Sequence, residues 1–157
     1  RYNVTGLYHD MWGFPSDNPG VVHGLIHHLT DKIKNNVHVI CRYKEYYLED
    51  ARTILISYGA SARSALHVVK NRRGRGERIG LLELQTLWPF YYDLIWEKCQ
   101  KARYIVVVEM NLGQIFRQVK MAVRHPERVF LANRVDGVFI TPTDIRNILR
   151  LIQGRGV

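Results

Sequence analysis

The sequence predicts an α/β domain with a mostly parallel, doubly wound sheet. Four short segments, apolar nearly throughout, recur along the chain from Thr53 onward, as strands that are buried on both faces do. Helical patterns of about 10 to 15 residues separate them, which is typical of βα units and a parallel sheet. At 157 residues the chain is long enough to bury a continuous core without disulfides or metals.

The chain opens on a stretch rich in turn residues, which predicts a loop or linker over residues 1–20. It begins with Arg1 and no charged and apolar leader precedes the body, so we expect a fragment or a processed product. Asn18 as N-cap and Pro19 in the first turn then predict a helix over Pro19–Lys34. The stretch Val37–Glu45 is too irregular for an assignment, although Tyr43, Tyr46 and Tyr47 suggest a segment that lies against another part of the protein.

From Thr53 a strand, a turn and a helix repeat in turn. The strands are expected at Thr53–Tyr58, Ile79–Leu84, Tyr104–Glu109 and Val129–Ala132, and the helices at Gly59–Asn71, Tyr91–Lys101, Leu112–Arg124 and Pro142–Gln153. The last helix has the clearest start, because Thr141 and Asp144 stand at the spacing of a capping box. No apolar run approaches the roughly 20 residues of a membrane span.

Three loops after the strands carry unusual residues, and in such a sheet they share the carboxyl edge. After the first strand, Ser61 near a helix N-terminus suits an anion, although a helix cap is the simpler interpretation. After the second, Trp88 and Phe90 predict either a contact surface or aromatics folded back onto the core, and both stay open. After the third, Asn111 and Gln114 follow Glu109, and these polar groups either tie neighbouring loops together or meet another domain.

Several chemistries find little support in the residues. Cys41 and Cys99 have no metal or redox spacing, and the single loop glycine Gly59 is too few for a dinucleotide fingerprint. His23 and His27 stand one helical turn apart, but no third metal ligand follows, so surface histidines are favoured. No candidate nucleophile has a general base at an identifiable position. We therefore expect no catalytic residue, no cofactor-binding residue and no metal ligand in this chain.

The formal net charge of +9 would suit a polyanion such as nucleic acid. The charge is spread along the chain, however, and its one dense run, residues 70–78, follows a helical pattern. Cations favour the C-terminal end of a helix, so a solvated helix end is the preferred interpretation. We expect neither a nucleic-acid nor a membrane partner.

Together the linker and loops resemble the α subunit of 2-oxoacid:ferredoxin oxidoreductases, in its domain similar to the transketolase C-terminal domain. The resemblance is carried, in family order, by Thr5–Asp10 with Gly13 and Pro15–Ser16, Arg42–Tyr46, Leu48–Ala51, Tyr58–Ala65, Gly80–Leu82, Thr86–Phe90 and Val108–Gln114. The chain departs from the family pattern at Glu83–Gln85 and at Tyr91, which bears on the substrate. The linker resembles that of 2-oxoglutarate enzymes more than that of pyruvate enzymes.

The resemblance implies a cytoplasmic enzyme that oxidatively decarboxylates a 2-oxoacid, expected to be 2-oxoglutarate, to its acyl-CoA and reduces ferredoxin. Thiamine diphosphate, Mg and iron–sulfur clusters are expected in the complete enzyme, and none of them in this fragment. The partners it implies are the β subunit and a missing N-terminal pyrimidine-binding domain, with ferredoxin and CoA for the whole complex. Residues 1–51 would then be a linker and lead-in helix, and residues 52–157 the transketolase C-terminal-like domain.

Within that domain we expect Ser61, Trp88, Phe90, Asn111 and Gln114 to form an assembly interface at the strand tips. The alternative is a free-standing α/β module that binds a small anion or nucleotide at the same tips.

Overall fold

The computed structural model of the protein describes residues 6–154, which form two compact units, one up to Ile40 and one from Cys41 onward. Thr5, the first residue of the expected linker motif, lies outside the described residues. The first unit holds helices α1 (Pro19–Lys34) and α2 (Val37–Ile40). The predicted N-cap is confirmed, because the Asn18 side chain accepts hydrogen bonds from the N–H groups of Gly20 and Val21 at 2.9 and 3.3 Å. None of the α1 residues is buried.

The second unit contains a five-stranded sheet in the order β1-β3-β2-β4-β5. Its strands are β1 (Tyr43–Tyr46), β2 (Thr53–Tyr58), β3 (Ile79–Leu84), β4 (Tyr104–Glu109) and β5 (Val129–Asn133). All neighbours are parallel except β1, which runs antiparallel to β3 at one edge. The four predicted strands are therefore confirmed, three of them to the residue. The irregular stretch of the sequence becomes α2 and β1. Tyr43 and Tyr46 belong to β1 and pack against the core, whereas Tyr47 after them is exposed.

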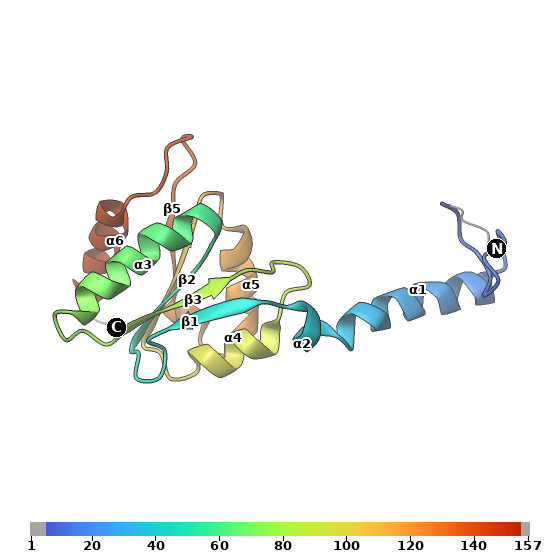
Figure 1. Ribbon diagram of the computed structural model, residues 1–157, viewed down its shortest axis with the longest axis horizontal. Helices are drawn as coiled ribbons and strands as arrows, with labels where there is room; N and C mark the ends of the chain where they lie inside the picture. Colours follow the sequence, from blue (N-terminus) through green and yellow to red (C-terminus); the bar gives the residue numbers. More distant parts are fainter. Residues whose placement is uncertain (1–5, 155–157) are drawn as a thin grey trace. The chain divides into compact units, whose positions relative to one another are not determined.

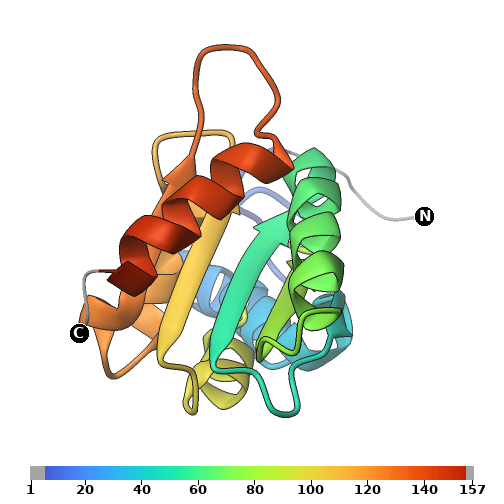
Figure 2. The same cartoon turned by 90° about the vertical axis from the view of Figure 1, so that its left-hand side faces the viewer.

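Two layers of helices cover the sheet (Figures 1 and 2). The helices α3 (Gly59–Arg73) and α6 (Pro142–Gly154) lie on one face, and α4 (Tyr92–Cys99) and α5 (Gln114–Ala122) lie on the other. A single turn of 3₁₀ helix, Pro126–Arg128, leads into β5. This is the doubly wound arrangement that the apolar strands predicted, since both faces of a parallel sheet need cover.

The core divides between the two faces of the sheet because strand side chains alternate in direction. Leu55 and Val106 face α3 and α6, whereas Ile56 and Val107 belong to the cluster under α4 and α5. The last helix begins as predicted, with the Thr141 N–H donating to the Asp144 carboxylate at 2.8 Å and the Asp144 N–H to the Thr141 hydroxyl at 3.2 Å.

Glycine is needed at one position inside β3, where the β1–β2 connection crosses closely. A Cβ atom at Gly80 would lie 2.5 Å from the Tyr47 carbonyl oxygen and 2.8 Å from the Leu48 side chain. Such a close backbone approach excludes any larger residue without a shift. In the described part of the chain, no helix is long and apolar enough to cross a membrane.

The order of the strands creates one switch point in the sheet. From β2 the chain passes through α3 to β3 on one side, and from β3 through α4 back to β4 on the other side of β2. The loops after β2 and β4 therefore lead to helices on opposite faces. In open α/β sheets a crevice for ligands commonly lies between two such loops.

Candidate functional site

The switch point is closed by a hydrogen-bond network among Tyr58, Glu109 and Asn111. The Tyr58 hydroxyl donates to Glu109 Oε2 at 3.2 Å and accepts from Asn111 Nδ2 at 2.5 Å. Burial, together with the neighbouring Glu109 carboxylate, raises the pKa of Tyr58, so its hydroxyl keeps its proton and remains a donor. The ends of β2 and β4 are therefore joined at the switch point by hydrogen bonds between the domain's own side chains.

Glu109 is fully buried and caps α5 from the end of β4. Its Oε2 accepts from the Ile115 N–H at 3.0 Å, and its Oε1 accepts from the Phe116 N–H at 3.0 Å. A carboxylate at a helix N-terminus is stabilised by these free N–H groups and by the helix dipole. The anion that this helix end could hold is thus supplied by the protein itself.

Asn111 ties together three segments at the carboxyl edge. Its Oδ1 accepts from the N–H groups of Gly113 and Gln114, both at 2.9 Å, and its carbonyl accepts from Asn133 Nδ2 at 2.8 Å. The sequence left open whether these polar groups join neighbouring loops or meet another domain. Glu109 and Asn111 join neighbouring loops. The Gln114 side chain is exposed at the start of α5.

Ser61 is buried within α3 and is not the cap that the simpler interpretation expected. The helix begins at Gly59, its N-cap residue is Tyr58, and no side chain caps it. The Ser61 hydroxyl donates to the Tyr58 carbonyl at 2.8 Å and lies 2.9 Å from the Ser57 hydroxyl, which donates to the Val108 carbonyl at 2.8 Å. Because β2 runs directly into α3, Ser61 lies in the first turn of the helix, where backbone carbonyls accept the hydrogen bond of its hydroxyl.

The loop between β3 and α4 separates the two aromatics that the sequence left undecided. The Trp88 side chain is 75% exposed. Phe90 is half-buried against the core and meets Tyr92 edge to face, with ring centroids 5.0 Å apart. The base of the loop is held by the Cys41 thiol, which donates to the Pro89 carbonyl at 3.1 Å. Phe90 is therefore folded back onto the core, as one of the two interpretations expected, whereas the Trp88 side chain is exposed to solvent.

A further loop, between β5 and α6, carries apolar side chains that sequence reasoning missed. Phe139 is 67% exposed, and Val135 and Val138 are exposed as well. Two ion pairs brace this loop, from Arg134 to Asp136 at 2.8 Å and to Asp144 at 3.3 Å. The loop rises beyond the ends of the strands next to α6 (Figure 2). The sequence could have indicated this loop, since three large apolar residues within residues 135–139 are unusual for a loop.

The carboxyl edge thus presents a set of exposed apolar side chains on separate loops. We call it the apolar rim and define it as Trp88 after β3, Leu112 after β4, and Val135, Val138 and Phe139 after β5. Beneath it, Ser61, Glu109 and Asn111 are engaged in hydrogen bonds within the domain. Of the predicted interface residues, Trp88 and Gln114 are exposed, Phe90 and Asn111 are half-buried, and Ser61 is buried.

The described residues do not fit the cofactors that the resemblance implies for the complete enzyme. Within residues 6–154 no three His, Cys, Asp or Glu side chains gather where a metal ion could bind. Iron–sulfur clusters are held by four cysteine thiolates, and the chain has two cysteines, both buried. Glu109, the one buried carboxylate side chain in the part of the chain that the structure describes, already accepts hydrogen bonds from the first turn of α5. We therefore derive no chemical step through these groups in this chain.

The two remaining candidates from the sequence are the histidine pair of α1 and the basic run of residues 70–78. His23 and His27 are exposed on α1, and their rings lie with centroids 4.3 Å apart at a tilt of 47°. The basic run covers the last turn of α3 and the turn before β3, where Arg72 pairs with Glu77 at 2.8 Å and Arg73 with Asp50 at 2.7 Å. Arg72 is buried, so the helix end is only partly exposed to solvent. This supports the interpretation of the run as a helix end.

Comparison with known proteins gives consistent results. The family described as pyruvate:ferredoxin oxidoreductase core domain II matches residues 51–145. The 2-oxoglutarate synthase subunit KorA of Methanothermobacter marburgensis is 38% identical over 148 residues, which cover 94% of this chain and 40% of that protein. The ketoisovalerate oxidoreductase subunit VorB of the same organism is 39% identical over 113 residues, covering 72% and 32%. The chain thus spans about two fifths or less of the length of these relatives.

Solved structures share the fold. A 2-oxoglutarate:ferredoxin oxidoreductase from Magnetococcus marinus, with 2-oxoglutarate, coenzyme A and succinyl-CoA bound, matches with a TM-score of 0.84 and 19% identity, over 97% of this chain and 27% of that chain. A split-gene transketolase, an inactive β4 tetramer, matches with a TM-score of 0.53 and 17% identity, over 71% and 40%. At such identities the likeness shows the fold alone, including its similarity to transketolase-like domains.

Proposed function

The chain belongs to the pyruvate:ferredoxin oxidoreductase core domain II family, and from this premise we propose that it is an assembly domain of a 2-oxoacid:ferredoxin oxidoreductase. The complete enzyme would oxidatively decarboxylate 2-oxoglutarate to its acyl-CoA and pass the electrons to ferredoxin. The likeness to 2-oxoglutarate synthase subunits over nearly the whole chain supports this substrate, whereas the relative named for ketoisovalerate matches a shorter part.

The chemistry of the enzyme would be carried outside this chain. Thiamine diphosphate with Mg and the iron–sulfur clusters need ligand sets that the described residues lack. The partners are accordingly a β subunit and a preceding pyrimidine-binding domain, with CoA and ferredoxin for the whole complex. In this proposal residues 1–51 link the two domains, residues 52–157 form the assembly domain, and the enzyme is cytoplasmic.

The observation that carries the assembly role is the apolar rim. Trp88 and Leu112 are at least 70% exposed, on loops whose bases are held by hydrogen bonds. Removing one such side chain from water on association is worth about 1.5 to 3 kcal/mol. Because the loops are already ordered, little of this gain is lost in fixing their conformation.

A free-standing module that binds an anion at the strand tips is disfavoured by the same geometry. The N-terminus of α5 is filled by the Glu109 carboxylate, and the Ser61 hydroxyl is taken up by a carbonyl. The switch point between β2 and β4 is closed by Tyr58. An anion entering there would meet a buried negative charge.

The proposal is tested on the parent enzyme, purified with its co-purifying subunits. We expect CoA-dependent reduction of ferredoxin with 2-oxoglutarate, and kcat/KM values for pyruvate and 2-oxoisovalerate at least tenfold lower. Preference for another 2-oxoacid would overturn the substrate, and the absence of co-purifying subunits would overturn the assembly role.

The contact surface is tested by Trp88→Ala and Phe139→Ala in the same enzyme. Each should weaken subunit or domain association by about tenfold or more, as expected from burying one large aromatic. The matched control is Met121→Ala, because Met121 is 64% exposed at the other end of α5. Equal effects of all three substitutions, or none from Trp88→Ala, would contradict a contact at the rim.

A further inference from the structure

Helices α3 and α6 pack against each other on one face of the sheet and run in the same general direction (Figure 2). Near their starts, the Ser64 hydroxyl of α3 donates to the Ile140 carbonyl, just before α6, at 2.8 Å. Near their ends, the Arg72 guanidinium donates to the Gln153 side-chain carbonyl at 3.1 Å. The outer sides of the two helices therefore form one continuous surface, and the apolar rim does not include it.

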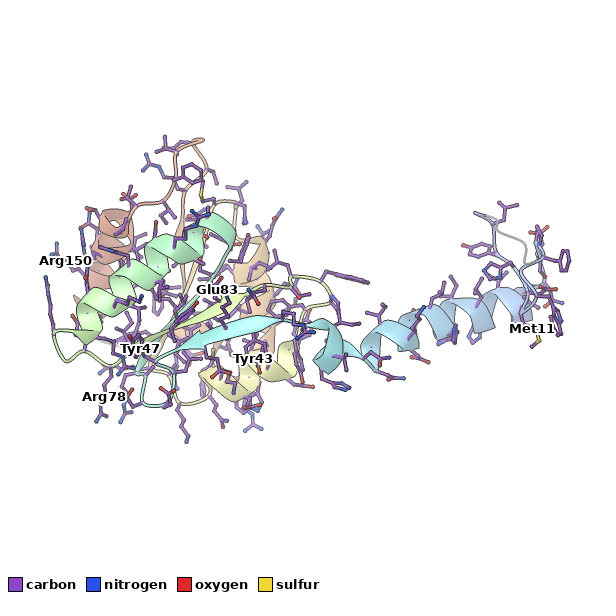
Figure 3. The ribbon with its side chains drawn as sticks, in the orientation of Figure 1. Met11, Tyr43, Tyr47, Arg78, Glu83 and Arg150 are labelled. Atoms are coloured by element: carbon purple, nitrogen blue, oxygen red, sulfur yellow. The ribbon has the colours of Figure 1, made fainter. Side chains whose placement is uncertain are left out.

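This surface carries four cations, which we call the basic face and define as Arg63 and Lys70 of α3 with Arg146 and Arg150 of α6. Residues seven or four apart lie on the same side of a helix, so each helix contributes one basic stripe. Arg63, Lys70 and Arg150 are exposed, and Arg146 is half-buried. The Arg150 side chain points away from the domain (Figure 3).

None of the four cations forms an ion pair with a carboxylate within residues 6–154. The Arg146 guanidinium donates to the Thr143 hydroxyl at 2.8 Å, which is a neutral partner. The charge of the basic face is therefore left without a counter-charge in this domain.

The two helices supply almost no acid of their own. The sequence of α3 contains no acidic residue, and α6 contains Asp144 alone. Asp144 already accepts from the Thr141 N–H at 2.8 Å and pairs with Arg134 at 3.3 Å. By contrast, Arg72 and Arg73 at the end of α3 each pair with a carboxylate. Unpaired cations on one surface repel one another, and an acidic partner would relieve that repulsion.

The composition of the surface favours a folded protein as the partner over a nucleic acid. Three of the four cations are arginines, which protein interfaces favour over lysine because the planar guanidinium binds carboxylates in pairs. Leu151, which follows Arg150, is 64% exposed, and an apolar side chain beside charged groups suits a contact that excludes water. Neither helix carries a Phe, Tyr or Trp on which a nucleic-acid base could stack.

We propose that the basic face docks the acidic surface of another subunit of the parent enzyme, as a second contact separate from the apolar rim. This inference rests on the assembly role proposed above. The two contacts differ in chemistry, because the rim gains from the burial of apolar side chains whereas the basic face gains from charge. The contact at the basic face is therefore screened by salt, and it fixes the orientation in which the partner approaches.

The docking is tested on the complete enzyme by combining Arg63→Glu with Arg150→Glu and measuring the dissociation constant of the subunits by analytical ultracentrifugation. An ion pair at about 4 Å is worth about fivefold in water, and each reversal replaces one attraction with one repulsion. We expect association to weaken by at least about tenfold at low salt, and the loss to shrink toward about 1 M salt, where charges are screened within about 3 Å. Both arginines are exposed and without ion pairs, so the variant should keep the melting temperature.

The matched control combines Arg117→Glu with Lys120→Glu, which makes the same change of charge at exposed positions of α5, on the other face of the sheet. It should leave association within about twofold of the unchanged enzyme. Equal weakening in this control, or unchanged association in the variant of Arg63 and Arg150, would overturn the docking at the basic face. Either result would leave the assembly role standing if Trp88→Ala still weakens association.

A second measurement needs no variant and compares the acetylation of Lys70 and Lys120 by acetic anhydride in the complete enzyme. Both lysines are exposed in this domain, so Lys70 should react several times more slowly only if a partner covers the basic face. Equal reaction of the two lysines would contradict the docking. Purification of the enzyme without other subunits would overturn the assembly role and this inference together.

Discussion

Replacing Glu109 tests how the carboxyl edge is held together. In Glu109→Ala, the N–H groups of Ile115 and Phe116 and the Tyr58 hydroxyl lose their acceptor in the interior. A buried donor left unsatisfied costs about 1 to 3 kcal/mol, and the carboxylate's own cost of burial, now relieved, offsets part of the sum. We expect the free energy of unfolding to fall by about 3 to 5 kcal/mol, a large part of the total stability of such a domain.

Two milder substitutions should follow in a fixed order. Glu109→Gln keeps one acceptor oxygen but turns an amide donor toward a backbone N–H, and it should cost about 2 kcal/mol. Tyr58→Phe removes two part-buried hydrogen bonds, the one that the hydroxyl donates to Glu109 and the one that it accepts from Asn111 Nδ2, and it should cost about 1 kcal/mol because water can reach these groups. The matched control is Glu97→Ala, which removes an exposed glutamate paired with Lys98 at 3.0 Å and should change stability by less than about 0.5 kcal/mol.

Urea unfolding followed by far-ultraviolet circular dichroism measures all four variants, with an unchanged dependence on urea as the sign that the transition stays comparable. A loss below about 1 kcal/mol for Glu109→Ala, or a larger loss for Tyr58→Phe than for Glu109→Ala, would refute the reasoning. Either result would mean that the N-terminus of α5 does not depend on this carboxylate.

Two further predictions concern the core. Gly80→Ala should destabilise the domain by about 1 to 3 kcal/mol in the same urea assay, because a Cβ atom would meet the Tyr47 carbonyl oxygen at 2.5 Å. Gly74→Ala, whose nearest neighbours lie at 3.6 Å, should cost little, and an equal cost at both sites would contradict the close approach. Burial raises the pKa of Cys99 from 9.0 to about 12, so the unfolded chain loses this proton first as the pH rises. Stability from this group is complete below about pH 8.5 and should then fall by up to about 1.4 kcal/mol per pH unit until about pH 12, a slope that Cys99→Ala should remove.

The resemblance to 2-oxoacid:ferredoxin oxidoreductases that the sequence predicted is confirmed. The residues that carry it lie on loops whose order along the chain is preserved. The family match and the fold both agree with it. The strands were predictable because residues buried on both faces must be apolar nearly throughout, a pattern that none of the helices within residues 6–154 shares. The helix starts at Asn18 and Thr141 were predictable because capping is a contact between residues two or three apart.

What the sequence by itself determined is therefore what local contacts and single-strand burial decide: the four parallel strands, the helices that connect them and the loops that meet at one edge. The tertiary structure decided how those loops use their side chains. Glu109 caps α5 and meets Tyr58 across 51 residues of chain, and Asn111 joins Asn133 across 22, contacts that no local pattern encodes. The exposure of Trp88 and Phe90 also depended on the hydrogen bond from the Cys41 thiol to the carbonyl of Pro89, which lies 48 residues away in the chain and holds their loop. Hydrogen bonds between residues so far apart exist only once the strands are paired, which is why the strand tips could be located from the sequence but their contacts could not.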